Sequence, residues 1–279
     1  MPGLVHAKPM TVAPALRPIV EGPIGGDCLV FVQGWPDDHT LWDDYIPYLR
    51  ERYRCVRVDL PNYPGAEQRR WGVSNEEIVE GLTACIRKVS PNRPVTIVGH
   101  DWGAWWTYML YVRHPELVTR IVGLDVAPHV RPTPLEAAIL VLYQGWLITA
   151  FLLGGRVGDW MTQTLARLVH TPRQGDSVRS AVNYPYLYTW RDFLTGRLLR
   201  GRRTWPDVPV LYAYGEDKPL RFHSEAWLAY LRSRPSNVVV PMSTMGHWVT
   251  KDPDFKYLLA EWLEATATPR RVLQQVAQR

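Results

Sequence analysis

An apolar run at 94–98 leads into Val98-Gly99-His100-Asp101-Trp102-Gly103, and a helix-like segment follows at 104–111. A short buried strand, a turn bracketed by glycines and then a helix form the layout of a nucleophile elbow. Such a turn strains its central residue and admits only small residues two positions before and after it, here Gly99 and Gly103. The central residue is Asp101, and we expect its side chain to project at the carboxyl edge of a sheet, above a helix N-terminus.

Apolar runs and amphipathic segments alternate through most of the chain. We expect strands at 28–32, 55–60, 94–98, 118–124, 208–214 and 237–240, and helices at 41–52, 75–88, 104–111, 224–232 and 255–266. A short hairpin is expected within the Pro- and Gly-rich residues 1–27. This alternation predicts an α/β protein with a doubly wound, mostly parallel sheet.

The alternation stops between 127 and 205, where the pattern is helical and rich in aromatic residues. We therefore predict a core formed by 1–126 and 206–279, with a helical cap at 127–205 inserted between two strands. Within the cap, residues 137–153 are almost wholly apolar and approach the length of a membrane span. A span there would separate the two halves of the sheet, so we expect a cap helix that lines an apolar pocket. The alternative is that its outer face contacts a membrane surface or a second subunit in a homodimer.

Composition narrows the class of protein. Of the 279 residues, 46% are hydrophobic and 21% charged, as in an ordinary globular protein. The net charge of +5 comes from scattered basic residues without a binding motif, so no nucleic-acid partner is expected. Three cysteines without disulfide or metal spacing, and no signal-peptide pattern, favour a cytoplasmic protein, with peripheral membrane contact as the alternative. No dinucleotide, phosphate-loop or metal motif is present, so we expect no cofactor.

Three motifs in order carry a resemblance to a known family. They are Gly34-Trp35-Pro36 after an early strand, Gly-His-Asp-Trp-Gly at 99–103, and Gly246-His247-Trp248 late in the chain. Over about residues 25–265 the sequence resembles the α/β-hydrolase superfamily, in the epoxide hydrolase and haloalkane dehalogenase branch that uses an aspartate nucleophile. The family usually has histidine where this chain has Gln33, a residue that can also hydrogen-bond and hold the loop.

The resemblance implies that Asp101 is the nucleophile and His247 the base. Carboxylate attack on an ester carbonyl would give an unproductive anhydride, whereas attack on an sp³ carbon gives an alkyl ester that activated water can hydrolyse. We therefore expect an apolar epoxide or alkyl halide as substrate, with water as the second reactant. In this family the backbone amides of Trp35 and Trp102 would stabilise the oxyanion.

The acid that partners the histidine has two candidates. Family members usually place it three residues beyond a glycine after the strand that follows the cap, but that position is Lys218, and Asp217 is offset by one. Some dehalogenases place it after the strand that precedes the cap, where this chain has Asp125. A buried strand rarely ends in an unpartnered carboxylate. We favour Asp125 and keep Asp217 as the alternative.

The leaving-group site distinguishes epoxide from halide. Epoxide hydrolases of this branch protonate the epoxide oxygen with two cap tyrosines, for which Tyr186 and Tyr188 are candidates. Dehalogenases hold the halide with nitrogen donors, and Trp102 or Trp190 could supply them. Epoxide hydrolysis to a diol is the favoured interpretation. The alternatives are a haloalkane dehalogenase and a non-catalytic ligand-binding protein that reuses the fold.

Overall fold

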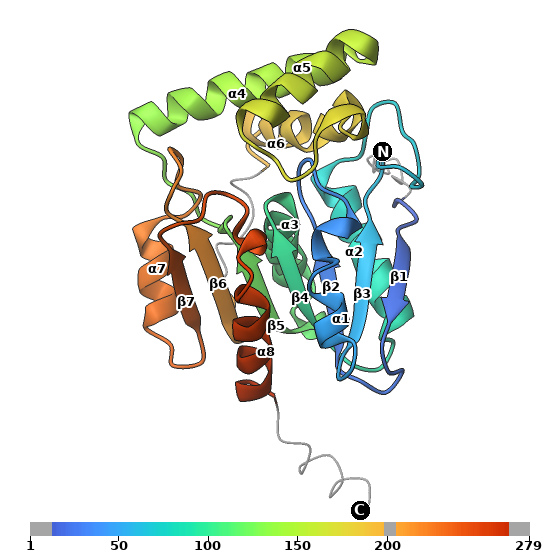
Figure 1. The fold of residues 1–279 in the computed structure, drawn as a ribbon, viewed down its shortest axis with the longest axis vertical. Coiled ribbons are helices and arrows are strands. Elements are labelled where there is room, and N and C mark those ends of the chain that lie inside the picture. The colour runs from blue at the N-terminus through green and yellow to red at the C-terminus, as the bar shows by residue number, and fades with distance from the viewer. Residues whose placement is uncertain (1–12, 198–204, 268–279) are drawn as a thin grey trace, which may run out of the picture.

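The computed structural model of the chain describes residues 13–197 and 205–267, and its centre is a seven-stranded sheet (Figure 1). The strand order is β1-β3-β2-β4-β5-β6-β7, with β1 antiparallel to β3 and all other neighbours parallel. The strands are β1 (Arg17–Glu21), β2 (Cys28–Val32), β3 (Arg54–Asp59), β4 (Val95–His100), β5 (Val118–Leu124), β6 (Val210–Gly215) and β7 (Val238–Met242). The prediction of a doubly wound, mostly parallel sheet is confirmed.

Helices cover both faces of the sheet and form two apolar layers. One layer holds α2 (Asn75–Val89), α3 (Trp102–Arg113) and α7 (Glu225–Arg232), and the other holds α1 (Ile46–Leu49) and α8 (Phe255–Ala265). Successive strand residues point to opposite faces, so Val30 packs in the first layer and Phe31 in the second. The central strands are buried on both faces, which is why they read as unbroken apolar runs.

Three further helices lie above the carboxyl edge of the sheet (Figure 1). They are α4 (Pro134–Leu153), α5 (Gly155–Leu168) and α6 (Tyr184–Leu194), all between β5 and β6 in the chain. Thr133 caps α4 in a reciprocal arrangement with Glu136, and Gly154, at φ 60°, ends α4 so that α5 can turn back across it. Asp159 on α5 accepts hydrogen bonds from the backbone amide and the hydroxyl of Ser180, each 2.8 Å long, and so ties α5 to the segment before α6.

Within the described residues, α4 is the one helix that is long and apolar enough to cross a membrane by length and composition, with a mean hydropathy of 1.7. Only 22% of its apolar stretch is buried. A single helix of this kind is weak evidence for a span, and α4 packs against α5 and α6 as part of the cap.

One local expectation is wrong. The helix expected at 41–52 is instead a 3-10 turn at His39–Trp42 followed by the short α1, because Pro47 has no amide hydrogen to continue a helix that starts earlier. A hairpin is expected within residues 1–27, and the described part of this segment holds the strand β1, which pairs with β3; residues 1–12 lie outside the described residues.

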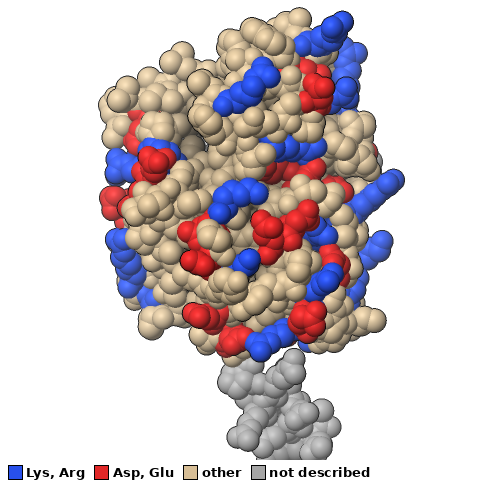
Figure 2. All heavy atoms as spheres, viewed as in Figure 1, with Lys and Arg blue, Asp and Glu red and all other residues tan. Residues whose placement is uncertain are grey.

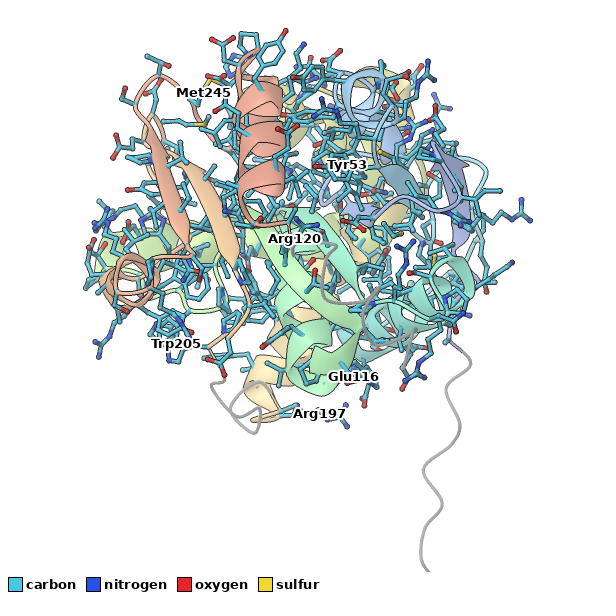
Figure 3. The ribbon with its side chains drawn as sticks, turned by 90° about the horizontal axis from the view of Figure 1, so that it is seen from below. Tyr53, Glu116, Arg120, Arg197, Trp205 and Met245 are labelled. Atoms are coloured by element: carbon cyan, nitrogen blue, oxygen red, sulfur yellow. The ribbon has the colours of Figure 1, made fainter. Side chains whose placement is uncertain are left out.

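At the edge of the sheet where the parallel strands begin, opposite the cap helices, a buried arginine joins the sheet to α8. Figure 3 views the molecule from this edge and shows Arg120 among the strand ends near α8. Its side chain donates to the Thr96 hydroxyl (2.9 Å) and to the Leu263 carbonyl (2.8 Å), and it is only 5% exposed. Arg120, on β5, is thus one hydrogen-bond donor that β4 and α8 share.

Replacing Arg120 with Met should lower the free energy of unfolding by about 2 kcal/mol, because Thr96 and the Leu263 carbonyl lose a buried partner while the packing of the stem is kept. Urea denaturation followed by circular dichroism measures the change. Arg197→Ala is the control, since Arg197 is exposed and should change the stability by less than about 0.5 kcal/mol. Equal effects of the two substitutions would contradict the role of Arg120.

Candidate active site

The turn after β4 gives Asp101 an unusual backbone conformation, with φ 53° and ψ −122°. Positive φ is rare for a residue with a side chain and marks local strain. The close approach around the turn explains its glycines. A Cβ on Gly103 would lie 2.0 Å from the Val32 carbonyl oxygen. The elbow therefore forms only because glycine lets α3 begin directly against β2.

The main chain after β2 converges on one oxygen of Asp101. The Trp35 amide donates to Asp101 Oδ2 at 2.8 Å. A Cβ on Gly34 would lie 2.5 Å from this oxygen and 2.6 Å from the Trp102 nitrogen, so the three groups are in close proximity. Trp102 is the first residue of α3, where an amide has no partner within the helix. The two predicted oxyanion residues thus lie beside Asp101 Oδ2.

His247 lies between two carboxylates. Its Nε2 is 3.5 Å from Asp101 Oδ1, and its Nδ1 donates to Asp125 Oδ2 at 2.5 Å. Burial on its own would lower the pKa of His247, but the charges of Asp125 and Asp101 outweigh burial and raise the pKa to about 9. The imidazole is therefore held as a cation while Asp101 is ionised.

Asp125 is fully buried directly after β5. Burial would raise its pKa, yet the charges and hydrogen bonds of His247 and Lys218 lower the pKa below its usual value. Asp217, the alternative acid, is exposed, and its backbone amide donates to the Met245 carbonyl. The structure therefore brings Asp125, and not Asp217, to His247.

The oxygen of Asp125 that faces away from His247 has two donors. The Lys218 ammonium lies 2.5 Å from Asp125 Oδ1, and the Gly215 amide donates to the same oxygen at 3.0 Å. Lys218 also donates to the Gly215 carbonyl and is nearly buried. In the sequence Lys218 stands only as a replacement for an expected acid. The signal for its role is that a basic residue there can pair with an acid at the end of the neighbouring strand β5.

Two cap tyrosines lie near Asp101. Tyr186, on α6, meets the ring of Trp102 edge to face with centroids 5.1 Å apart. Tyr143, on α4, lies against Tyr186 at 6.1 Å. Burial raises the pKa of both hydroxyls, and the charge of Asp101 acts in the same direction on both. Tyr143 was missed because it sits within an apolar run that reads as packing.

The other two predicted cap residues lie elsewhere. Tyr188 is half-buried, with the Arg191 guanidinium 4.4 Å from its ring centroid. The Trp190 indole donates to Gln144 Oε1 at 2.7 Å, and Gln144 Nε2 donates to the Tyr143 hydroxyl at 2.9 Å. In the described part of the chain no contact joins either residue to Asp101. Trp190 therefore reaches the site only through Gln144, which orients Tyr143.

The indoles near Asp101 differ in their hydrogen bonds. Trp35 Nε1 donates to Asn183 Oδ1 at 2.8 Å, whereas Trp102 Nε1 has no partner at ordinary hydrogen-bond geometry. Its interaction with the Tyr186 hydroxyl nevertheless acts to lower the pKa of that tyrosine, so a ligand would share the Trp102 indole with Tyr186. No group of three His, Cys, Asp or Glu side chains that could hold a metal is found among residues 13–197 and 205–267.

The chain belongs to the alpha/beta hydrolase family, whose model matches residues 29–255. Its fold is similar to that of a putative epoxide hydrolase from Pseudomonas aeruginosa, with a TM-score of 0.69 and 21% identity, over 90% of this chain and 92% of that one. These findings confirm the predicted α/β-hydrolase fold.

Two relatives illustrate the sequence matches. Epoxide hydrolase 2 of Caenorhabditis elegans is 31% identical over 114 residues, which cover 40% of this chain and 31% of that protein. A cis-3-alkyl-4-alkyloxetan-2-one decarboxylase of Xanthomonas campestris is 23% identical over 277 residues, covering 85% of this chain and 88% of that protein. The chain spans about a third or less of the length of the curated relatives that it matches at 31–33% identity. With the Pseudomonas fold, these matches confirm the resemblance to epoxide hydrolases.

Replacing Lys218 with Met should raise the pKa of His247 above about 9, because a nearby cation no longer opposes protonation and Asp125 loses a competing partner. An NMR titration of the imidazole nitrogens measures the shift. Lys88→Met, at an exposed position near the end of α2, is the matched control and should leave the titration unchanged.

The same pKa sets a pH dependence of stability. The folded pKa of His247 is above its ordinary value of 6.5, so its contribution to stability is complete below pH 6.5 and is lost as the pH rises through about 9. Lys218→Met should move this loss to higher pH. An unchanged His247 titration in Lys218→Met would contradict the coupling.

Proposed function

We propose that this protein is a hydrolase that opens epoxides to vicinal diols through an ester on Asp101. The observation that carries the proposal is the pair of cap tyrosines, Tyr143 and Tyr186, which lie against each other and against Trp102, the residue that follows Asp101. A carboxylate nucleophile suits an sp³ carbon, and two phenol donors suit the alkoxide that leaves when an epoxide ring opens. The apolar cap favours a lipophilic substrate.

In the first step Asp101 Oδ1 attacks a ring carbon and the C–O bond of the epoxide breaks. Oδ2 is the oxygen held by the Trp35 amide, so Oδ1, which faces His247, is the nucleophile. The leaving oxygen takes a proton from a tyrosine. Because the Tyr143 hydroxyl accepts its hydrogen bond from Gln144, its own proton remains available for donation. The product of this step is a hydroxyalkyl ester of Asp101.

In the second step water attacks the carbonyl carbon of that ester. Esterification removes the charge of Asp101, one of the two carboxylates that raise the pKa of His247, so the pKa falls and the imidazole becomes an effective base. The oxyanion forms on Oδ2, beside the Trp35 and Trp102 amides. The proton that the imidazolium loses restores the tyrosine hydroxyl, and Asp125 holds the neutral histidine while it accepts a proton from the attacking water. When the oxyanion collapses, the bond to the alkyl oxygen breaks and the departing alkoxide takes the proton of the newly formed Asp101 carboxylic acid, which releases the diol and restores the Asp101 carboxylate.

The alternatives have less support. A halide needs nitrogen donors, but the indoles of Trp35 and Trp190 donate to Asn183 and Gln144, and the indole of Trp102 interacts with the Tyr186 hydroxyl. A second candidate is opening of a strained cyclic ester. It is supported by the Xanthomonas decarboxylase, whose name describes an oxetanone substrate and whose match covers most of both chains. A non-catalytic role is disfavoured by the intact pairing of His247 with Asp125 and Asp101.

The variant His247→Gln should stall as the Asp101 ester, because no base remains to activate water. Intact-protein mass spectrometry after incubation with lipophilic epoxides should show a gain equal to the whole epoxide, absent in His247→Gln/Asp101→Asn. A gain only with alkyl halides, equal to the substrate minus hydrogen halide, would make the protein a dehalogenase. A gain only with β-lactones would favour the cyclic-ester candidate, and no adduct from any panel would contradict an enzyme of this mechanism.

Phenylalanine at position 143 or 186 should slow ester formation in the His247→Gln background, because the leaving alkoxide loses a proton donor. We expect each single substitution to cost about tenfold and the double substitution at least about 100-fold. Single-turnover formation of the mass adduct measures the rate. Tyr188→Phe removes a cap hydroxyl that is not near Asp101, and it should leave the rate within about twofold. Equal losses at positions 188 and 186 would contradict the assignment.

A further inference from the structure

The outer surface of α4 and α5 carries a large exposed apolar area, which we call the cap face. Its members are large hydrophobic side chains that project away from the core: Leu135, Val141, Leu142, Trp146, Leu152, Leu153, Val157, Trp160, Leu168 and Val169. Leu135, Leu142 and Leu168 are each 72–74% exposed. A contiguous apolar area of this kind marks a site of interaction, because leaving it in water is unfavourable.

The cap face is separate from the active site although both use α4. Leu147 and Phe151 point inward and are buried, and Tyr143 also faces the core, toward Tyr186. Leu142 and Trp146 lie on the opposite side of the same helix. A helix is about 10 Å across, so the cap face lies about one helix diameter from the tyrosines. Figure 1 shows α4 and α5 side by side at the outer end of the molecule.

On α4 and α5 the acidic side chains have partners, whereas two arginines are exposed. The one acid on α4, Glu136, is only 8% exposed and pairs with Arg221, while the one acid on α5, Asp159, bonds to Ser180. Arg156 and Arg167 are exposed, and within the described residues no acid forms an ion pair with either. In Figure 2 the upper edge over α4 is tan, and both blue and red side chains appear toward the α5 end. The cap face is therefore apolar, and its border carries Arg156 and Arg167, whereas Asp159 is paired with Arg179.

Two tryptophans lie within the cap face. Trp146 and Trp160 are 38% and 57% exposed, with ring centroids 6.4 Å apart, one on each helix. The Trp146 indole donates to the Met161 carbonyl at 2.9 Å, which holds its ring at the junction of the helices. Tryptophan is enriched at the boundary between lipid and water because its ring is apolar and its N–H is polar.

A cavity at one end of the cap face has the same chemistry. It has a volume of about 430 Å³ and lies where α4 turns into α5, with Phe151, Leu152 and Leu153 along its wall. Arg70 and Arg179 also line it, together with Asp159, whose carboxylate lies 3.9 Å from Arg179 Nε. Asp159 offsets the charge of Arg179, so the apolar walls suit an acyl chain and Arg70 is the arginine that would meet an anionic headgroup.

We propose that the cap face docks the protein onto a bilayer that contains anionic phospholipid, with α4 and α5 lying in the plane of the interface. The apolar side chains enter the headgroup boundary, and Arg156 and Arg167 face lipid phosphates. A second copy of the chain is the less fitting occupant, because a symmetric pairing would bring the same cationic borders together. The proposal is independent of the proposed function, since docking needs no turnover.

Flotation of the full chain with phosphatidylcholine vesicles, with and without 25% phosphatidylglycerol, tests the proposal. We expect the protein to float with the anionic vesicles and much less with phosphatidylcholine alone. Leu142→Glu/Leu153→Glu should reduce the floating fraction at least fivefold, and Arg156→Gln/Arg167→Gln should reduce it and weaken its dependence on salt. The matched control is Ile24→Glu, because Ile24 is 85% exposed between β1 and β2, at the edge of the sheet away from the cap.

Thermal unfolding of each variant shows that the fold is kept, since all substituted side chains are exposed. Sedimentation velocity tests whether a second copy of the chain, rather than a bilayer, covers the cap face. A dimer that Leu142→Glu/Leu153→Glu dissociates, without flotation of the native chain, would overturn the proposal and make the cap face a subunit interface. Flotation that these two substitutions leave unchanged, or the absence of flotation with both vesicles, would also overturn it. Because every readout is binding, failure of epoxide turnover leaves the result unaffected.

Discussion

The close approach of three main-chain segments at Asp101 is the constraint on which the site depends. The end of β2, the turn after β4 and the start of α3 meet with so little space that any Cβ on Gly34 or Gly103 would collide with a neighbouring segment. This contact directs one carboxylate oxygen toward the Trp35 amide and leaves the other facing His247. The strain of the positive φ at Asp101 is offset by the packing of the strands and helix around it.

Charge alternation explains how four ionisable groups share a largely buried space. Asp101, His247, Asp125 and Lys218 follow one another with alternating sign, so each charge has an opposite neighbour. A buried charge is costly unless it is paired and hydrogen-bonded. In the proposed mechanism, esterification of Asp101 would control the histidine, because the charge of Asp101 is one cause of the raised pKa of His247. The cap tyrosines would act in that mechanism when an oxygen leaves.

Local patterns predicted the sheet and elbow well, because buried parallel strands read as apolar runs and glycine brackets a strained turn. Local patterns failed where contacts between distant parts of the chain determine the structure. The helix expected at 41–52 begins only at Ile46, where Pro47 fits the first turn, and β1 pairs with β3 from a distant part of the chain. Tyr188 and Tyr186 are two residues apart on one helix, so they point in different directions, and only packing against the core selects Tyr186.

The sequence by itself determined the α/β alternation, the aspartate at the centre of the elbow, and the order of the three motifs. These features depend on residue type and spacing along the chain, where strand and helix periods act. Only the tertiary structure decided that His247 meets Asp125, that Lys218 holds the other oxygen of that acid, and that Tyr143 joins Tyr186 above Asp101. The first two pairs are 122 and 93 residues apart in the chain, and the two tyrosines lie on different helices, α4 and α6. The fold brings them together because parallel strands end at the same edge and the cap closes over it.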